Sequence, residues 1–263
     1  MNRALALLVL LAALPAQAND LAKDLAPTGT LRATYIATNP VQAFVDPATK
    51  EVRGPAAELT RTLAGRAGLP FTIQGANGVQ GVIDSVKNGE ADIGFVAFDP
   101  TRATQVDFTQ AYALAQNTYL VAEGSPIRLA ADADKPGIRI GVGARDAGDH
   151  FLTRTLKHAE LKRNEGGNLE VALRQLAAGE IDAYAGNRMR LHGVVQKTPG
   201  LRLVADNFYG VEQSVIVPKG NAARLTMVEK FLDEARTSGL IAESIARAGL
   251  VGVDVAPAKP RTQ

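Results

Sequence analysis

The segment FDPTRATQVDFTQAY, residues 98–112, places its one arginine where a helix is expected to begin. Asp99 is typical of an N-cap and Pro100 of a first helical residue, so Arg102 would lie in the opening turn. The positive end of the helix macrodipole disfavours a cation there by roughly 0.3–1 kcal/mol. A guanidinium is suited to a two-pronged contact with a carboxylate. An arginine at this position is therefore expected to have a favourable interaction that offsets the cost, and the rest of the sequence indicates which one.

Other side chains that could carry out catalysis or hold a metal are few. The chain has no cysteine, which removes thiolate metal sites and cysteine nucleophiles. Its histidines, His150, His158 and His192, are scattered and show no His-x-x-x-His spacing. The serines lack the context of a nucleophile elbow. We therefore expect no catalytic residue, no metal site and no cofactor.

The first eighteen residues, MNRALALLVLLAALPAQA, are organised like a secretory signal peptide. Arg3 precedes an apolar run from Ala4 to Leu14, and Ala16-Gln17-Ala18 has the small-x-small form of a cleavage site. The apolar run is well short of the ~20 residues that a bilayer needs. The alternative interpretation is a buried N-terminal helix. The pattern predicts that residues 1–18 are removed and that the mature chain is exported.

Composition favours a free periplasmic protein that is not lipid-anchored. Without cysteine there are no disulfides and no lipid-modified N-terminal cysteine. Cleavage would remove one of 29 basic residues against 27 acidic ones, which leaves a net charge of +1. Nucleic acids and anionic membranes require clustered basic charge, so neither is expected as a partner. Arg188 and Arg190 are the nearest approach to a cluster and are interpreted as a solvated face.

Two pairs of similar strings indicate a repeated α/β unit. NGEADIGF (88–95) and AGEIDAYA (178–185) each follow a helix-like segment and carry Gly-Glu-x-Asp before an apolar run. The glycine of each fits the left-handed position that ends a helix. GTLRATY (29–35) and GIRIGVG (137–143) are both strand-like with a glycine before them. Strand, helix and strand therefore recur in two halves of the chain.

Helical periodicity between these strings completes the pattern. The segments 55–68 and 146–159 have apolar residues at helical spacing. Alternating strands and helices predict an α/β fold with parallel sheets covered on both faces, where ligands bind at the carboxyl ends of the strands. The remaining expected elements are strands at 117–126 and 211–220 and helices at about 222–236 and 241–248.

The order of these elements predicts two lobes in the mature chain. Residues 19–121 would form the first lobe, and residues 122–212 would form the second. The chain would then return, so that residues 213–263 complete the first lobe. A mature chain of this length can hold two modest domains.

The chain resembles family 3 of the bacterial extracellular solute-binding proteins, the amino-acid-binding components of ABC importers, along nearly all its mature length. The most specific likeness is the Arg-x-x-x-x-Asp-Phe-Thr spacing from Arg102 to Thr109; weaker ones are GTLR, GEADIGF, KPGIRIGVG, LTRTLKHAEL and AGEIDA. The resemblance implies a type II periplasmic binding protein fold, with two hinge strands and a ligand cleft between two lobes that close. It also implies a monomer whose partners are a small-molecule ligand and an importer permease.

The resemblance offers a role for the unusual arginine. In the family, the residue at the position of Arg102 binds the α-carboxylate of the ligand. A guanidinium and the free N–H groups of a helix start would both attract that carboxylate. The alternative is a surface ion pair of Arg102 with Asp99 or Asp107.

Three positions depart from the family's amino-acid pattern. Ala97 replaces a hydroxyl residue that helps to hold the ligand, Asp146 lies in a loop that is usually Gly-Thr-Thr-like, and Asn187 replaces the aspartate that binds the ligand's ammonium. An ammonium left unpaired in a closed cleft is costly. Asp146 could supply the missing charge or could simply cap the next helix. The expected ligands therefore include organic acids and amino-acid derivatives without an ammonium as well as amino acids.

Three further residues, Phe98, Asn39 and Asn77, correspond to positions that line the cleft in the family. Family members often carry aromatic residues at the two asparagine positions, so asparagines suggest a more polar cleft, although asparagine in a turn needs no ligand. The function expected is that of a non-enzymatic binding protein which delivers a carboxylate-bearing ligand to an importer. The alternatives are a small enzyme of the elimination or dehydratase type on the same fold and a ligand sensor for a receptor.

Overall fold

The computed structural model describes residues 22–165 and 168–258. The expected signal peptide, residues 1–18, lies outside these ranges. Within them, no helix has the length and apolar character needed to cross a lipid bilayer.

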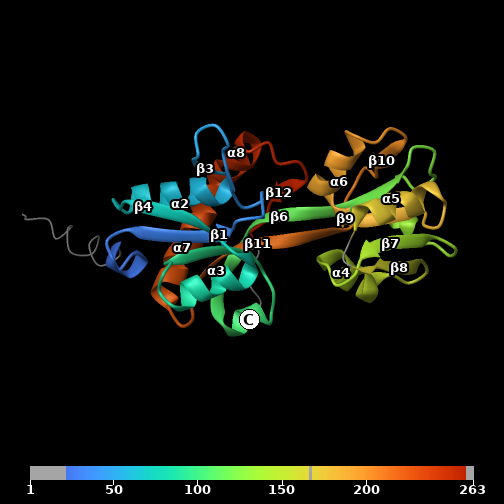
Figure 1. The fold of residues 1–263 in the computed structure, drawn as a ribbon. Helices are drawn as coiled ribbons and strands as arrows, with labels where there is room; N and C mark the ends of the chain where they lie inside the picture. Colours follow the sequence, from blue (N-terminus) through green and yellow to red (C-terminus); the bar gives the residue numbers. More distant parts are fainter. Residues whose placement is uncertain (1–21, 166–167, 259–263) are drawn as a thin grey trace, which may run out of the picture.

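The first lobe is built on a parallel sheet of three strands, β1 (Leu31–Ile36), β4 (Phe71–Ala76) and β5 (Ile93–Ala97). Ala33 of β1 pairs with Ile73 on one side and with Ile93 on the other. The helices that lead into β4 and β5 are α2 (Pro55–Arg66) and α3 (Gly78–Lys87). These helices pack into two separate core clusters, so both faces of the sheet are covered, as Figure 1 shows.

The second lobe repeats this plan with strands β7 (Arg139–Gly143), β8 (Glu160–Asn164) and β9 (Ala183–Asn187). β7 lies in the middle and pairs parallel with both neighbours. Its helices and its short strand are α4 (Ala147–Thr155), α5 (Leu169–Ala177), α6 (Arg188–Val195) and β10 (Leu201–Leu203). The predicted α/β repeat is thus present in both lobes.

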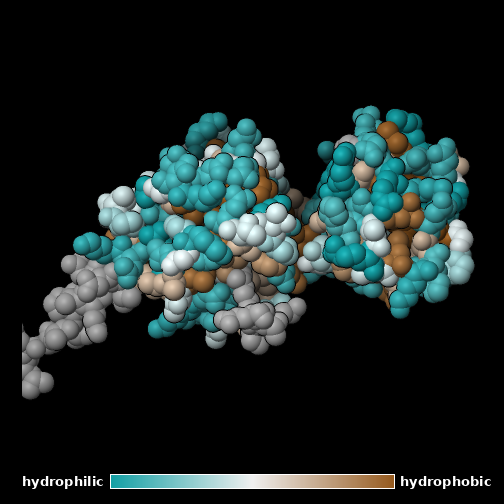
Figure 2. Space-filling model, turned by 90° about the horizontal axis from the view of Figure 1, so that it is seen from below, coloured by the Kyte–Doolittle hydropathy of each residue, from teal (hydrophilic) through white to brown (hydrophobic). Residues whose placement is uncertain are grey.

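Two long antiparallel strands join the lobes, β6 (Val106–Ala122) and β11 (Tyr209–Pro218). β11 pairs with β5 of the first lobe, while residues 117–120 of β6 pair with β9 of the second. The strand order is therefore β4-β1-β5-β11-β6-β9-β7-β8. Figure 1 shows both strands crossing from lobe to lobe, and Figure 2 shows a narrow waist at that place.

The strand expected at 117–126 is longer than predicted and starts earlier, because β6 begins at Val106 and pairs along most of its length with β11. Residues 117–120 already pair with the second lobe. The division of the chain at 121/122 and 212/213 stays a prediction that this pairing does not decide.

The chain returns to the first lobe after β11, through α7 (Ala222–Thr237), α8 (Leu240–Arg247) and β12 (Val253–Val255). Arg224 of α7 is 5 % exposed and donates to the main-chain oxygens of Asp24 and Asp92 at 2.9 and 3.1 Å. The first lobe also carries a small hairpin of β2 (Phe44–Val45) and β3 (Val52–Arg53).

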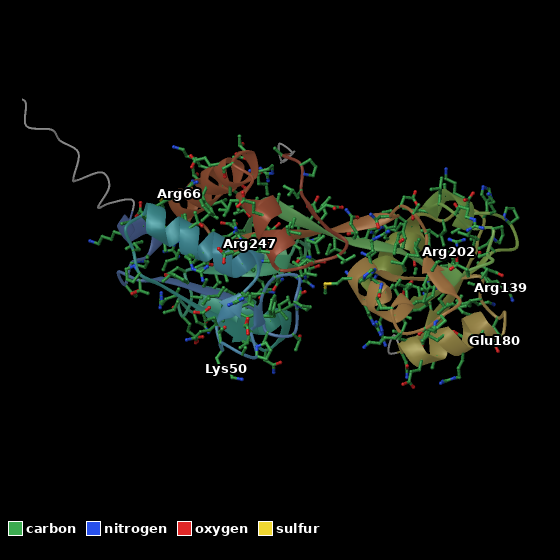
Figure 3. The ribbon with its side chains drawn as sticks, turned by 90° about the horizontal axis from the view of Figure 1, so that it is seen from above. Lys50, Arg66, Arg139, Glu180, Arg202 and Arg247 are labelled. Atoms are coloured by element: carbon green, nitrogen blue, oxygen red, sulfur yellow. The ribbon has the colours of Figure 1, made fainter. Side chains whose placement is uncertain are left out.

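The same arginine–aspartate pair occurs once in each lobe. Arg32 donates from Nε and Nη2 to the two carboxylate oxygens of Asp92 at 3.1 and 2.8 Å. Arg139 does the same with Asp182, at 3.0 Å for both bonds. The Gly-Glu-x-Asp strings thus supply structural partners for the arginine at the amino end of β1 or β7. Figure 3 shows Arg139 at the end of the second lobe that is far from the first, so the carboxyl end of β7 points toward the first lobe.

Candidate functional site

A cleft of about 350 Å³ lies between the lobes, at the carboxyl ends of β1, β5 and β9. This volume is within the range of small-molecule sites. Both lobes and both long strands contribute to it. Its lining residues include Asn39, Ala97, Arg102, Asn117, Asp146, Tyr184, Asn187, Arg190 and Gln213. Of the seven site residues expected from the sequence, five therefore lie in one cleft.

Arg102 enters the cleft from the first lobe on a tightly held turn. The Oδ1 atom of Asp99 accepts hydrogen bonds from the main-chain amides of Thr101 and Arg102 at 2.9 and 3.1 Å. The half-buried Arg102 side chain donates from Nη1 to the main-chain oxygen of Ala97 at 2.9 Å. The main chain and the guanidinium of Arg102 are thereby both held in place. The bond to Ala97 uses only one guanidinium N–H, so most of the N–H donors remain for other partners.

The α-helix predicted to begin at Pro100 is wrong. The segment forms only a single 3₁₀ turn, Arg102–Thr104, before β6 begins at Val106. The pairing of β6 with β11 outweighs the capping signal of Asp99 and Pro100. A turn this short has no useful macrodipole, so the cleft around Arg102 owes its positive character to the guanidinium.

The surface pairing considered for Arg102 is not formed among the residues that the structure describes. Asp107 forms an ion pair with Lys219 at 2.8 Å, and Asp99 accepts the main-chain amides of its own turn. No ion pair of Arg102 lies within the described ranges. Arg102 thus presents a positive charge to the cleft without a carboxylate from this part of the chain.

Asp146 lines the cleft from the second lobe and also caps a helix. It is the N-cap of α4, and its Oδ1 accepts from the main-chain amide of Asp149 at 2.7 Å. The side chain remains exposed at the edge of the cleft, where partial desolvation by its neighbours raises its pKa. The two interpretations of Asp146 are therefore compatible, because one oxygen caps the helix and the carboxylate still faces the cleft.

Asn187 plays a similar capping part at α6. Its Oδ1 accepts from the main-chain amide of Arg190 at 3.1 Å. This arrangement brings the side chain of Arg190 to the cleft lining. The interpretation of Arg188 and Arg190 as one solvated face is wrong, since Arg188 is half-buried and donates to the main-chain oxygen of Asp206 at 3.0 Å.

The floor of the cleft is formed by two buried amides on the long strands. Asn117 of β6 and Gln213 of β11 are 5 % and 3 % exposed. Gln213 accepts from Nε2 of the fully buried Gln42 at 3.3 Å, and Gln42 in turn accepts from the main-chain amide of Ile36 at 3.0 Å. This chain fixes a polar group at the place where the lobes join.

Two expected site residues, Phe98 and Asn77, are absent from the cleft lining in the described part of the chain. Phe98 packs edge-on against Phe108, with ring centroids 5.3 Å apart. Asn77 is exposed and precedes α3 as its N-cap. Asn39 does line the cleft, and its Oδ1 accepts from the main-chain amide of Val41 at 3.2 Å. A role in ligand binding for these residues stays a prediction.

Sequence reasoning missed four polar residues of the cleft, Asn117, Tyr184, Arg190 and Gln213. None of the four gave a clear signal. Asn117 and Gln213 each stand between two other polar residues, and a tyrosine in a buried strand or an arginine in a helix is ordinary.

None of the three histidines lines this cleft. His150 lies on α4 and His192 on α6, while His158 follows α4. The ionisable groups of the cleft are therefore two arginines, one aspartate and one tyrosine.

The fold and the cleft between its lobes define a two-lobed binding protein of the type II periplasmic class. The model of family 3 of the bacterial extracellular solute-binding proteins matches residues 31–248. The chain belongs to this family. Comparison with curated protein sequences gave no match.

Solved structures agree on the fold. One is the second substrate-binding domain of a Streptococcus pneumoniae protein described as an amino acid ABC transporter, with 21% identity, a TM-score of 0.67, and coverage of 84% of this chain and 100% of that one. Another is the same organism's amino acid ABC transporter substrate-binding protein bound to L-arginine, with 19% identity, a TM-score of 0.58, and coverage of 86% and 97%. A third is an ancestral cyclohexadienyl dehydratase, with 22% identity, a TM-score of 0.59, and coverage of 84% and 92%.

Proposed function

We propose that this protein is a periplasmic solute-binding protein that closes on a small carboxylate-bearing ligand and delivers it to the permease of an ABC importer. The observation that carries the proposal is the position of Arg102. Its guanidinium lines the cleft, is held by the Ala97 oxygen, and has no ion pair within the described ranges. A carboxylate would supply the missing charge through two parallel hydrogen bonds.

The cleft also favours a ligand that is small and polar. Its ionisable lining residues carry two positive charges and one negative charge at neutral pH, and its floor offers amides. Family membership and the ABC transporter neighbours support a binding role. The ligand would sit between the lobes, and contacts to both would hold the closed form, which is the usual behaviour of hinged binding proteins.

Binding without turnover is part of this proposal. An elimination needs an acid or a base placed against the reacting atoms, and the cleft offers only Asp146 with a raised pKa as a carboxyl group. That carboxyl is already engaged as a helix cap. Incubation of candidate acids with concentrated protein, followed by analysis of the products, would overturn this part if a new compound formed.

Export by the predicted signal peptide and a monomeric state complete the proposal. Expression of the full chain in a bacterium with a periplasm should give a mature protein that begins near residue 19, as measured by intact mass. Size-exclusion chromatography with light scattering should give the mass of one chain.

The binding proposal is tested by isothermal titration of the protein, residues 19–263, with a panel of amino acids, their N-blocked derivatives and small carboxylic acids. At least one should bind, and Arg102→Ala should abolish that binding while leaving the fold intact. Equal affinity of the two proteins for every ligand that binds would contradict the proposal.

A further inference from the structure

Gln213 of β11 lies directly across the sheet from Ala97 of β5, the residue whose main-chain oxygen holds Arg102. The two residues are Cα partners in the antiparallel pairing of β11 with β5, and both line the cleft. Directly opposed residues in such a pair point to the same face of the sheet, with Cβ atoms about 4.5–5.5 Å apart. Nη1 of Arg102 donates to the Ala97 oxygen at 2.9 Å. The Gln213 side chain and the Arg102 guanidinium therefore both meet the cleft at the carboxyl end of β5.

The orientation of the Gln213 amide is fixed by a backbone group. The main-chain amide of Ile36 can only donate, so the atom of Gln42 that faces it at 3.0 Å is the side-chain oxygen. The other end of the Gln42 amide is then the nitrogen, which also can only donate, and it faces Gln213 at 3.3 Å. Gln213 must therefore turn its oxygen toward Gln42, which leaves its nitrogen at the other end of the amide.

This nitrogen is only weakly engaged by the protein. Nε2 of Gln213 donates to the main-chain oxygen of Val211, another cleft residue, over a long distance of 3.5 Å, and makes no other hydrogen bond within the described ranges. Well-formed bonds of this kind are about 2.7–3.2 Å long. An amide nitrogen carries two N–H donors, and Gln213 is only 3 % exposed. A buried donor in this state gains free energy when a ligand oxygen accepts from it.

We infer that Gln213 binds the same ligand carboxylate as Arg102, and that Gln42 is the positioning residue that keeps the Gln213 nitrogen toward the cleft. This inference rests on the proposed function and adds a second contact to its carboxylate site. Ala97 has no hydroxyl to donate, and its partner on the opposite strand supplies a donor in its place. The two oxygens of a carboxylate match two sets of donors, whereas the N–H₂ end of a ligand amide would face one of them. The site therefore selects a carboxylate over an amide.

Two substitutions of Gln213 test the donor. In isothermal titration of the protein, residues 19–263, the probe is the tightest binder among the common L-amino acids, their N-acetyl derivatives, acetate, L-lactate, succinate and glutarate. Gln213→Met removes the donor and should weaken binding of the probe about tenfold, the loss of one charge-assisted hydrogen bond. Gln213→Glu keeps an acceptor for Gln42 but sets a negative charge against the carboxylate of the probe. It should weaken binding about a hundredfold or more.

The comparison of these two variants separates ligand contact from a structural role. If Gln213 only supported Gln42, Gln213→Glu would preserve that bond and bind the probe better than Gln213→Met. Gln116→Met is the matched control, because Gln116 lies on the neighbouring strand β6, donates to Asp254 at 2.8 Å and does not line the cleft. It should leave the affinity unchanged. All variants are compared at a temperature at which circular dichroism shows them folded.

The positioning role of Gln42 is tested by a double-mutant cycle. Without Gln42 the Gln213 amide can turn over and present its oxygen to the cleft, so Gln42→Met should weaken binding of the probe about twofold or more. The double variant with Gln42→Met and Gln213→Met should bind as tightly as Gln213→Met alone, because no amide is left to orient. A further loss in the double variant would show that Gln42 does not act through Gln213.

The outcomes distinguish this inference from the function on which it rests. If Arg102→Ala abolishes binding while both Gln213 variants bind the probe as tightly as the unaltered protein, the Gln213 contact is wrong and the proposed function stands. The same conclusion follows if Gln213→Glu binds at least as tightly as Gln213→Met. If no compound binds, or Arg102→Ala binds the probe as tightly as the unaltered protein, the proposed function and the inference fail together.

Discussion

The guanidinium of Arg102 is hydrogen-bonded at 2.9 Å to the main-chain oxygen of Ala97, the residue at the carboxyl end of β5. Ala97 has no side-chain hydroxyl to offer a ligand, yet its backbone holds the arginine in place. The bond uses one of the five N–H donors of a guanidinium. The sheet of the first lobe therefore positions a cation at the cleft, and the identity of the ligand depends on what balances that charge.

Replacement of Arg102 by alanine should remove carboxylate binding with little effect on folding. The loss of one partner of a charge pair in a closed cleft costs at least ~2 kcal/mol, about thirtyfold in affinity. Isothermal titration with whichever acid binds the unaltered protein measures this change. Arg154→Ala is the control on the surface. An affinity within threefold of the unaltered protein would show that Arg102 is not the carboxylate site.

The two arginine–aspartate pairs should differ in their contribution to stability, although their geometry is alike. Asp92 has a side chain 1% exposed and also lies near Arg224, while Asp182 has a side chain 32% exposed. Asp92→Asn leaves the buried Arg224 and the partly exposed Arg32 without this carboxylate and should cost about 3–5 kcal/mol of unfolding free energy. Asp182→Asn removes a partly solvated pair and should cost about 1 kcal/mol or less. Urea denaturation compares the two, and equal costs would contradict the role given to burial.

Gln42 should matter for stability although it does not line the cleft. Gln42→Met keeps the approximate volume but removes the acceptor of the Ile36 main-chain amide and the donor to Oε1 of Gln213. Each unsatisfied buried group costs about 1–3 kcal/mol. The midpoint of urea unfolding should fall accordingly. A midpoint equal to that of the unaltered protein would mean that these groups find other partners.

Asp146 should make the protein less stable as the pH rises above the acid range. Its folded-state pKa is raised, so the stability that it contributes is complete below the unfolded-state value near 4 and is lost as the pH rises through the folded-state value. Asp146→Asn keeps a good helix cap but cannot ionise. The Tm of the variant minus that of the unaltered protein should therefore increase from pH 4 to pH 7. A difference that stays constant or decreases over this range would contradict the raised pKa.

Much of the fold could be predicted because its signals are local. The glycines of the two Gly-Glu-x-Asp strings have φ values of 73° and 66°, which is the left-handed conformation expected after a helix. The helix expected at 222–236 is observed as Ala222–Thr237. The helix expected at Pro100 failed for a non-local reason, since the pairing of β6 with β11 takes up the following residues.

The site could be predicted only in part, because several of its residues come together through the tertiary fold. Arg102, Asp146 and Asn187 each follow or begin an element whose end was visible in the sequence. Arg190 reaches the cleft only because α6 starts directly at the end of β9, where Asn187 caps it. Gln213 lies at the cleft in the part of β11 that joins the two lobes, where the pairing of β11 with β6 has a register shift between Gln213 and Ser214. Neither arrangement has a local sequence signature.

The most direct test of the central claim is a thermal-shift comparison of the protein, residues 19–263, with its Arg102→Ala variant against the same carboxylic acids and amino acids. At a hundredfold excess over its dissociation constant, a ligand that closes the cleft stabilises the protein by about 2.7 kcal/mol, a shift in Tm of roughly 5–10 °C for a chain of this size. We predict such a shift for at least one acid and none for the variant. The same shift in both proteins, or none with any acid, would contradict a carboxylate site at Arg102.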